Sequence, residues 1–200
     1  MDVWVIIAAL TGYVLGSIPF GLALTKLAGL GDIRAIGSGN IGATNVLRTG
    51  RRDLALATLL LDGFKAGLAV LILTAVSGER HVGLIAGASA FLGHCYPVWL
   101  NFKGGKGVAT YAGLLIFTSW PGLVVGLPIW LGVFALSRIS SLAALSAAAA
   151  VPAGALLLGE THFAVLTLLF LSVLIFWSHR DNIGRLLKGT EPRFGQKTTE

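Results

Sequence analysis

Long apolar stretches separated by short polar segments define the pattern of this 200-residue chain. A helix that crosses the hydrocarbon core of a bilayer needs about 20 mostly apolar residues. Five stretches fit that requirement, at residues 3–25, 54–76, 82–102, 139–158 and 161–177. A cleaved signal peptide would begin with basic residues. The only charged residue before the first stretch is the acidic Asp2, so we expect this stretch to be a retained span.

Residues 107–137 form a further uncharged stretch of 31 residues, which is long for one span and short for two. Basic residues gather on the cytoplasmic side of membrane proteins, so the charge distribution can decide between the two. Two spans separated near Trp120 and Pro121 give 13 basic residues inside and one outside, whereas one span gives seven on each side. We therefore predict an all-α transmembrane bundle of seven spans, with short fourth and fifth helices. The N-terminus would lie outside and the C-terminus in the cytoplasm.

The composition supports a membrane protein and excludes most other classes. Hydrophobic residues make up 55% of the chain, charged residues 12%, and the mean hydropathy is +0.83. A soluble domain carries about 25% charged residues, so this chain is neither disordered, nor a coiled coil, nor an ordinary soluble enzyme. The single cysteine, Cys95, excludes an intramolecular disulfide and argues against a cysteine-rich metal site.

The predicted topology gathers the polar parts of the chain on one side of the membrane. The cytoplasmic segments would be residues 26–53, 99–107, 138–139 and 178–200. The external loops are very short, and no internal repeat of the kind found in transporters is visible. We therefore treat residues 1–200 as a single integral membrane domain whose chemistry takes place at its cytoplasmic face.

The first cytoplasmic segment contains a glycine-rich motif, Gly-Ser-Gly-Asn-Ile-Gly-Ala-Thr-Asn, at residues 37–45. Closely spaced glycines let backbone N–H groups turn inward and form an anion-binding concavity. Neutral donors and a guanidinium suited to phosphate accompany them. The candidate binding residues are Gly37, Ser38, Gly39, Asn40, Thr44, Asn45 and Arg48. The alternative is a flexible linker, which would not need Asn, Thr and Arg among the glycines.

The second segment ends in a glycine- and lysine-rich motif directly before an apolar stretch. Its candidate phosphate-binding residues are Lys103, Gly104, Gly105, Lys106 and Gly107. The motif would present backbone N–H groups at a helix N-terminus, where anions are stabilised. Its glycine spacing and the absence of Ser or Thr after the lysine do not match a nucleotide-binding P-loop. Lysines that only fix the topology are the alternative, but they would not explain the glycines.

The third segment places His179 and Asn182 three residues apart at the end of the last apolar stretch. Such residues share one face of a helix, and histidine is the side chain best able to accept a proton near neutral pH. Apolar residues at helical spacing within 183–187 predict a short interfacial helix. Ser141 lies in the shortest cytoplasmic turn, where it could contribute to the same pocket or only begin a helix.

Two charged residues, Asp62 and Lys65, lie inside the second apolar stretch. Charged residues within a span are functional candidates by default, but a mutually neutralising structural pair explains them equally well. His94 and Cys95 are candidates for buried packing residues, Cys95 above all. No cluster of His, Cys and carboxylates resembles a metal site, so no cofactor is expected.

Residues 37–48, 94–110 and 179–186 resemble, in order and spacing, the three signature segments of the bacterial acyl-phosphate-dependent glycerol-3-phosphate acyltransferases. The combination of the motif at 37–45 with Gly-Gly-Lys-Gly-Val-Ala-Thr is specific, and the resemblance covers essentially the whole chain. It implies that Ser38 and Arg48 are essential and that His179 and Asn182 are functional, which makes these four the candidate catalytic residues. It also implies phosphate binding by Gly104, Gly105 and Gly107. Asp181 stands where the family usually has Glu, which is one methylene longer.

The resemblance implies transfer of a fatty acyl group from acyl phosphate to the 1-hydroxyl of glycerol 3-phosphate, giving lysophosphatidic acid and phosphate in phospholipid biosynthesis. The partners would be these substrates and membrane lipids, without nucleic acid or an obligate protein partner, in the bacterial inner membrane. Because acyl phosphate is already activated, Ser38 is expected to hydrogen-bond to a phosphate or to the developing oxyanion, not to act as a nucleophile. His179 or a phosphate oxygen would take the proton, while Lys106 and Arg48 would hold the phosphates.

The competing class is a membrane transporter for a phosphorylated metabolite. It accounts for the apolar spans and the basic loops, but it predicts polar residues along a continuous path and substantial structure on both faces. A structural, non-catalytic membrane subunit is a third possibility, which the density of Ser, Thr, Asn and Gly in the inner loops disfavours.

Overall fold

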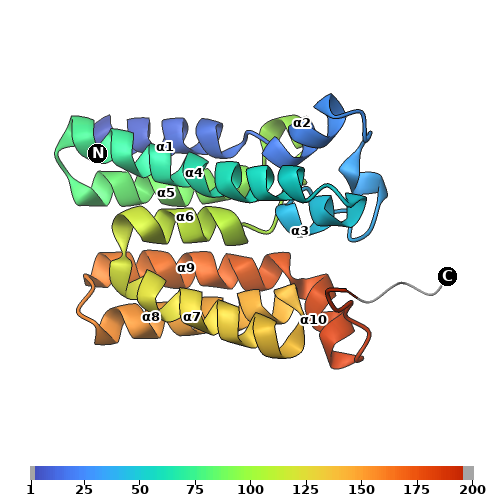
Figure 1. Cartoon of the computed structure of the whole chain (residues 1–200). Coiled ribbons are helices and arrows are strands. Elements are labelled where there is room, and N and C mark those ends of the chain that lie inside the picture. The colour runs from blue at the N-terminus through green and yellow to red at the C-terminus, as the bar shows by residue number, and fades with distance from the viewer. Residues whose placement is uncertain (1–2, 196–200) are drawn as a thin grey trace. The chain divides into compact units, whose positions relative to one another are not determined.

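The computed structural model describes residues 3–195, and the regular structure within this range is entirely helical. Contacts divide the chain into two compact units, an N-terminal unit (Met1–Thr118) and a C-terminal unit (Ser119–Glu200). The N-terminal unit contains α1 (Val3–Gly16), α2 (Phe20–Leu27), α3 (Ala43–Val46), α4 (Arg52–Ser77), α5 (Arg80–Cys95) and α6 (Val108–Thr118). The C-terminal unit contains α7 (Trp120–Ser137), α8 (Ser140–Leu157), α9 (His162–Ser178) and α10 (Arg180–Leu187) (Figure 1).

The predicted spans correspond to helices in the structure. Five apolar helical segments are long enough to cross a membrane, at Val3–Leu27, Arg52–Ser77, Arg80–Leu100, Trp120–Ser137 and Ser140–Leu157. α9 and α10 together form a sixth candidate that bends by 61°. α6 has only 11 residues, or about 16 Å of helix at 1.5 Å per residue. The all-helical membrane fold is therefore confirmed, whereas the seven-span count and the orientation remain predictions.

The break predicted near Trp120 and Pro121 is present. α6 ends at Thr118 and α7 begins at Trp120. The hydroxyl of Ser119 caps α7 by accepting from the N–H of Gly122 at 3.2 Å. Proline is favoured in the first turn of a helix because its missing N–H would have no helical partner there. Pro121 therefore marks the start of a new helix.

Close packing of helix backbones holds the N-terminal unit together. α1 packs along α5, and α4 packs on α5 and α6. A Cβ on Gly12 or Gly16 of α1 would lie about 2 Å from the carbonyl oxygen of Ala86 or Ala90 of α5. Small residues allow helices to approach closely in membranes, where packing replaces the hydrophobic driving force. These glycines therefore set the distance between α1 and α5.

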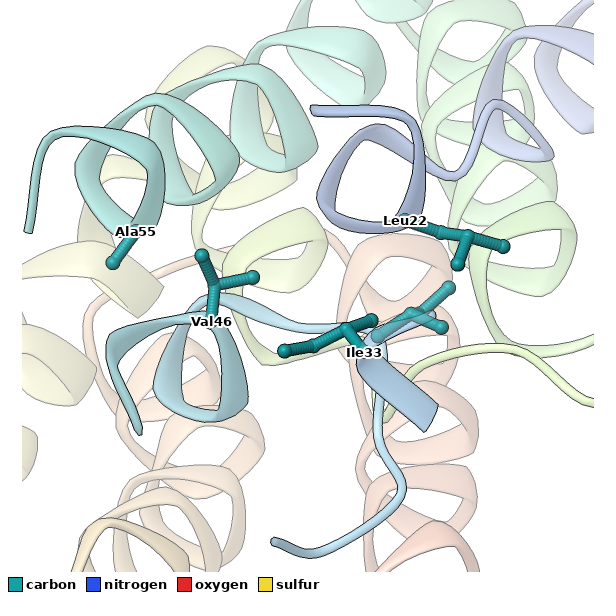
Figure 2. Packing of buried hydrophobic residues seen from close by; sticks show 5 residues of the cluster. Leu22, Ile33, Val46 and Ala55 are labelled. Atoms are coloured by element: carbon teal, nitrogen blue, oxygen red, sulfur yellow. The ribbon is translucent and has the colours of Figure 1, made fainter. Parts of the chain in front are cut away.

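The first span is interrupted at Ser17–Pro19, although the sequence indicated one continuous stretch. α1 ends at Gly16 and α2 begins after Pro19. Beyond this bend, a small apolar core holds the first cytoplasmic segment in place. The residues of this core are Leu22, Ile33, Ile41, Val46 and Ala55 (Figure 2). Full burial of each larger aliphatic side chain contributes about 1.5–3 kcal/mol, so this segment is folded and is not a flexible linker.

Candidate active site

The side chain of Asn45 organises the first cytoplasmic segment. Asn45 is 2% exposed, and its Nδ2 donates to the carbonyls of Ile33 (2.9 Å), Ile36 (3.1 Å) and Asn40 (2.8 Å). Its Oδ1 accepts from the N–H of Ser38 at 3.1 Å. An amide NH₂ has two donors, and here both are committed to the backbone of the segment. Asn45 was expected to bind phosphate, but in this structure it closes the loop.

The loop that Asn45 closes brings the Arg48 side chain against Gly37, the residue before Ser38. Gly37 has a φ of +56°, which glycine adopts without strain. A Cβ at Gly37 would lie 2.4 Å from Asn45 Oδ1 and 2.5 Å from Arg48 Cδ. Arg48 therefore lies across Gly37, and the side chains of Ser38 and Arg48 are both exposed. The hydroxyl of Ser38 and the guanidinium of Arg48 are therefore both at the surface of this loop.

The other predicted residues of this loop divide by exposure. Gly39 also has a positive φ, of +68°. Asn40 accepts from the N–H of Gly42 at 2.8 Å and so forms a local turn. Thr44 is exposed at the start of α3. Thr44 thus keeps the position expected of a substrate donor, whereas the carbonyl oxygen of the Asn40 side chain serves the loop.

The glycines of the second motif are required by contact with the end of α5. A Cβ at Gly104 would lie 2.1 Å from the carbonyl oxygen of His94, and one at Gly105 would lie 2.0 Å from His94 Nε2. Gly107 has a φ of +81°, and a Cβ there would lie 2.1 Å from the ring of Phe91. The sequence indicated that these glycines allow a ligand to approach the backbone. The atoms that approach them in the structure belong to the protein itself.

Two of the N–H groups expected to face an anion have protein partners instead. The N–H of Gly104 donates to the carbonyl of Cys95 at 3.0 Å, and that of Gly105 donates to the carbonyl of His94 at 2.9 Å. These two donors are therefore bonded within the protein, and phosphate binding by Gly104 and Gly105 stays a prediction. The first turn of α6 still presents N–H groups that have no helical acceptor. Lys103 is exposed and Lys106 is half-buried beside this turn.

Packing also connects the two loops of the N-terminal unit. Leu100, which precedes the second motif, packs against the apolar core formed by Leu22, Ile33, Ile41, Val46 and Ala55. In the first turn of α6, the hydroxyl of Thr110 is fully buried and has no hydrogen-bond partner among residues 3–195. A buried polar group without a partner is uncommon, and a ligand hydrogen bond would be gained there.

In the C-terminal unit, His179 lies at the bend between α9 and α10 and is 3% exposed. Its ring Nδ1 lies 2.8 Å from the carbonyl oxygen of Ile175. A carbonyl oxygen only accepts, so Nδ1 carries the proton in that hydrogen bond. Nε2 is then the ring nitrogen that carries the lone pair.

A carboxylate that the sequence did not single out binds the other predicted residues of this unit. Glu191 Oε1 accepts from Asn182 Nδ2 (2.5 Å) and from Ser141 Oγ (2.7 Å), and its Oε2 accepts from Arg185 Nε (2.7 Å). Burial raises the pKa of the Glu191 carboxyl, but these three hydrogen bonds outweigh it and hold the pKa below its ordinary value. The only signal in the sequence was an acidic residue between Lys188 and Arg193 in the basic tail.

Asp62 and Lys65 form a buried ion pair of 3.0 Å, with His94 Nδ1 2.8 Å from the ammonium of Lys65. This geometry fits the structural pair that the sequence left as one of two possibilities. Cys95 is 3% exposed, as expected of a packing residue. Within residues 3–195 we find no group of three or more His, Cys, Asp or Glu side chains that could hold a metal ion.

The predicted site residues thus fall into two groups, one in each compact unit. The N-terminal unit contains the loops at 37–48 and 103–107, and the C-terminal unit contains Ser141, His179 and Asn182. A shallow hollow of about 300 Å³ near the C-terminus is lined by Leu136, Ser137, Arg138, Arg193, Phe194 and Gly195. None of the predicted catalytic residues lines this hollow, so it is not a candidate for the reaction site.

Residues 6–189 match the family model described as glycerol-3-phosphate acyltransferase. The chain is 68% identical to the glycerol-3-phosphate acyltransferase of Hyphomonas neptunium, over 96% of this chain and 93% of that protein. It is 60% identical to that of Maricaulis maris, over 96% of this chain and 88% of that protein. It is also similar to the crystal structure of PlsY (YgiH), an integral membrane glycerol 3-phosphate acyltransferase, in its glycerol 3-phosphate form. The TM-score is 0.89, the sequence identity is 36%, and 96% of each chain is covered. For the lysophosphatidic acid form, the TM-score is 0.86.

Proposed function

The chain belongs to the glycerol-3-phosphate acyltransferase family, and from this premise we propose that it moves a fatty acyl group from acyl phosphate to the 1-hydroxyl of glycerol 3-phosphate. The products are lysophosphatidic acid and inorganic phosphate. The transporter and the non-catalytic subunit are set aside, because the chain is a member of an enzyme family with an all-helical membrane fold.

The observation that carries this proposal is that the buried ring of His179 is held in the orientation and tautomer that a base requires. The hydrogen bond from Nδ1 to the carbonyl of Ile175 fixes both the tautomer and the orientation of a buried ring. Asn182 lies about one helical turn after His179, and its side-chain amide donates to Glu191 Oε1 at 2.5 Å. A base that is fixed before substrate arrives loses little entropy in the reaction. In the C-terminal unit, His179 Nε2 accepts the proton of the attacking hydroxyl, and Asn182 orients that hydroxyl.

We assign the phosphate groups to exposed donors and to the half-buried Lys106. Arg48, in the same loop as Ser38, is suited to phosphate because a guanidinium forms paired hydrogen bonds with its oxygens. Lys103 and Lys106, together with the first turn of α6, supply further positive charge. The leaving group is phosphate, so the acyl carbon needs no covalent enzyme intermediate. The serine hydroxyl donates to an oxyanion or to a phosphate oxygen.

The same proposal includes seven spans, with the chemistry at the cytoplasmic face of the bacterial inner membrane. It rests on the 13 basic residues that this topology places inside, against one outside. Glu79 and Lys188 are both exposed and would lie on opposite sides. In a Cys95→Ala background, a membrane-impermeant maleimide added to intact cells should label Glu79→Cys but not Lys188→Cys. Labelling of Lys188→Cys alone would reverse the orientation.

The donor is tested with purified protein in detergent, given radiolabelled glycerol 3-phosphate and a 16-carbon acyl phosphate. We expect lysophosphatidic acid without added coenzyme A, metal or nucleotide. Product formed from acyl coenzyme A but not from acyl phosphate would overturn the proposal that acyl phosphate is the donor.

His179→Gln should lower kcat about 100-fold or more at saturating substrate. His81 is an exposed histidine, and His81→Gln should leave kcat unchanged. Near-normal turnover of His179→Gln would transfer the role of base to a substrate phosphate oxygen.

A further inference from the structure

A cluster of three buried polar side chains lies in the apolar part of the N-terminal unit, and the proposed reaction does not use it. Asp62 and Lys65 project from α4 and His94 from the end of α5, and they are 2%, 3% and 4% exposed. Burying charged groups is costly, and apolar side chains of similar size often give equal or better stability. A cluster of this kind therefore calls for an explanation beyond stability.

The ammonium group of Lys65 lies at the centre of the cluster. Its Nζ donates to the carbonyl of Ile18 (2.9 Å), to Asp62 Oδ1 (3.0 Å) and to His94 Nδ1 (2.8 Å). An ammonium has three N–H donors, so each of them has an acceptor. Because an ammonium cannot accept, His94 Nδ1 must carry a lone pair. The ring of a neutral His94 then has its proton on Nε2.

The Nε2 edge of that ring supports the second glycine-rich loop. A Cβ at Gly105 would lie 2.0 Å from His94 Nε2, so the ring lies directly against the backbone of Gly105. The carbonyls of His94 and Cys95 accept from the N–H groups of Gly105 and Gly104, at 2.9 and 3.0 Å. The His94 ring and two backbone hydrogen bonds from the end of α5 therefore hold this loop together.

The same ammonium group also fixes the bend between α1 and α2. Ile18, whose carbonyl it binds, lies in that bend, and Lys65 Nζ is 5.8 Å from the centre of the Phe20 ring. The neighbouring carbonyl of Ser17 accepts from Trp99 Nε1 at 2.7 Å. The cluster thus ties together α4, the end of α5 and the α1–α2 bend, and Trp99 ties the segment that leads into the loop to the same bend.

We propose that Asp62, Lys65 and His94 form a positioning triad that holds the loop at Lys103–Gly107 in its phosphate-binding conformation. Asp62 and the Ile18 carbonyl orient the ammonium of Lys65. Lys65 orients the His94 ring, and the ring supports Gly105. None of the three touches substrate. This role rests on the proposed function, since it is Lys103, Lys106 and the first turn of α6 that bind phosphate.

Two pairs of variants test the triad. His94→Asn keeps an acceptor near the position of Nδ1, whereas His94→Leu has nearly the same size as Asn but no acceptor. Asp62→Asn with Lys65→Met removes both charges together, so that no unpaired charge stays buried. Thr58→Val is the matched control, because Thr58 is fully buried in α4. Among residues 3–195, its hydroxyl bonds only to the carbonyl of Leu54 in its own helix, at 2.7 Å.

The first measurement is the steady-state kinetics of lysophosphatidic acid formation. His94→Leu and the double variant should raise the KM of one phosphate-bearing substrate about tenfold or more, with kcat and the other KM within about threefold. His94→Asn should lie between His94→Leu and the unaltered enzyme. Loss of folded protein alone would lower the apparent kcat and leave both KM values unchanged. That pattern, or a Thr58→Val variant that matches His94→Leu, would overturn the proposal.

The second measurement does not depend on activity. The amide hydrogens of Gly104 and Gly105 bond to α5, so peptides that cover 103–107 should exchange with deuterium faster in His94→Leu and in the double variant. They should exchange at the unaltered rate in Thr58→Val. If exchange responds but the unaltered enzyme does not use acyl phosphate, the triad stands and the proposed donor fails. If neither exchange nor KM responds, the triad proposal fails.

Discussion

The two glycine-rich loops of the N-terminal unit look alike in the sequence but use glycine for different reasons. Gly37 and Gly39 of the first loop are exposed and have positive φ angles. Gly104 and Gly105 have no positive φ, and protein atoms of α5 occupy the space that a Cβ would need. Gly39 therefore needs glycine for its conformation, whereas Gly104 and Gly105 need it for contact. A glycine-rich motif is therefore not in itself evidence that a ligand approaches the backbone.

Gly107, like Gly37, combines both requirements, but its added Cβ would meet the fully buried ring of Phe91, so its substitution should have the largest effect. A Cβ there would lie 2.1 Å from the Phe91 ring at a φ of +81°. Overpacking costs about 1–3 kcal/mol and the left-handed conformation about 1–2 kcal/mol more. Gly107→Ala should therefore lower the free energy of unfolding by about 3 kcal/mol, measured by denaturation in mixed micelles.

Gly50→Ala is the control, because Gly50 has nearly the same φ, +82°, but nothing lies within 4 Å of the position that an added Cβ would take. It should cost only about 1 kcal/mol. Equal losses for the two variants would show that conformation alone explains Gly107. The contact between this loop and α5 would then not limit the choice of residue.

Asn45→Leu should have the next largest effect, in the first loop. It keeps the size of the side chain but leaves three carbonyls and one N–H without their partner. Because water can reach part of this loop, we expect the free energy of unfolding to fall by about 2–3 kcal/mol, together with loss of activity.

Ser38→Ala is the comparison. It should lower kcat/KM about 100-fold and change the free energy of unfolding by less than about 0.5 kcal/mol. A stable but inactive Asn45→Leu variant would instead support direct contact with substrate.

Substitution of Gly39 tests the conformational requirement without a close contact, and its effect on stability should be smaller. Its φ is +68°, and the only atom within 4 Å of an added Cβ is the carbonyl oxygen of Arg34, at 3.4 Å. Gly39→Ala should cost about 1 kcal/mol, and Gly39→Asn less, since Asn tolerates the left-handed region better. Gly107→Asn should show no such recovery relative to Gly107→Ala. Recovery at both positions would remove the distinction between the two loops.

The sequence was sufficient for features that depend on local pattern. Apolar runs predicted the helices, and the uncharged stretch with Pro121 predicted the interruption that the structure shows at Ser119. It was not sufficient for pairs that meet across the fold. Lys65 reaches the carbonyl of Ile18, 47 residues away, and Ser141 reaches Glu191, 50 residues away. No periodicity encodes such contacts, so only the folded structure identifies the partners of these side chains.

Glu191 should show the smallest effect, and one that depends on pH. Its folded-state pKa lies below its ordinary value of 4.5, so the carboxylate stabilises the fold above that value and loses its contribution as the pH falls through the folded-state pKa. Glu191→Gln should lower the apparent Tm at pH 7 by an amount that corresponds to less than about 1 kcal/mol. The difference from the unaltered enzyme should shrink as the pH falls below 4.5. The difference for Asn45→Leu should stay constant over the same range, because its hydrogen bonds involve neutral groups. A Glu191→Gln difference that persists in acid would mean that the shape of the side chain, not its charge, holds Ser141 and Asn182.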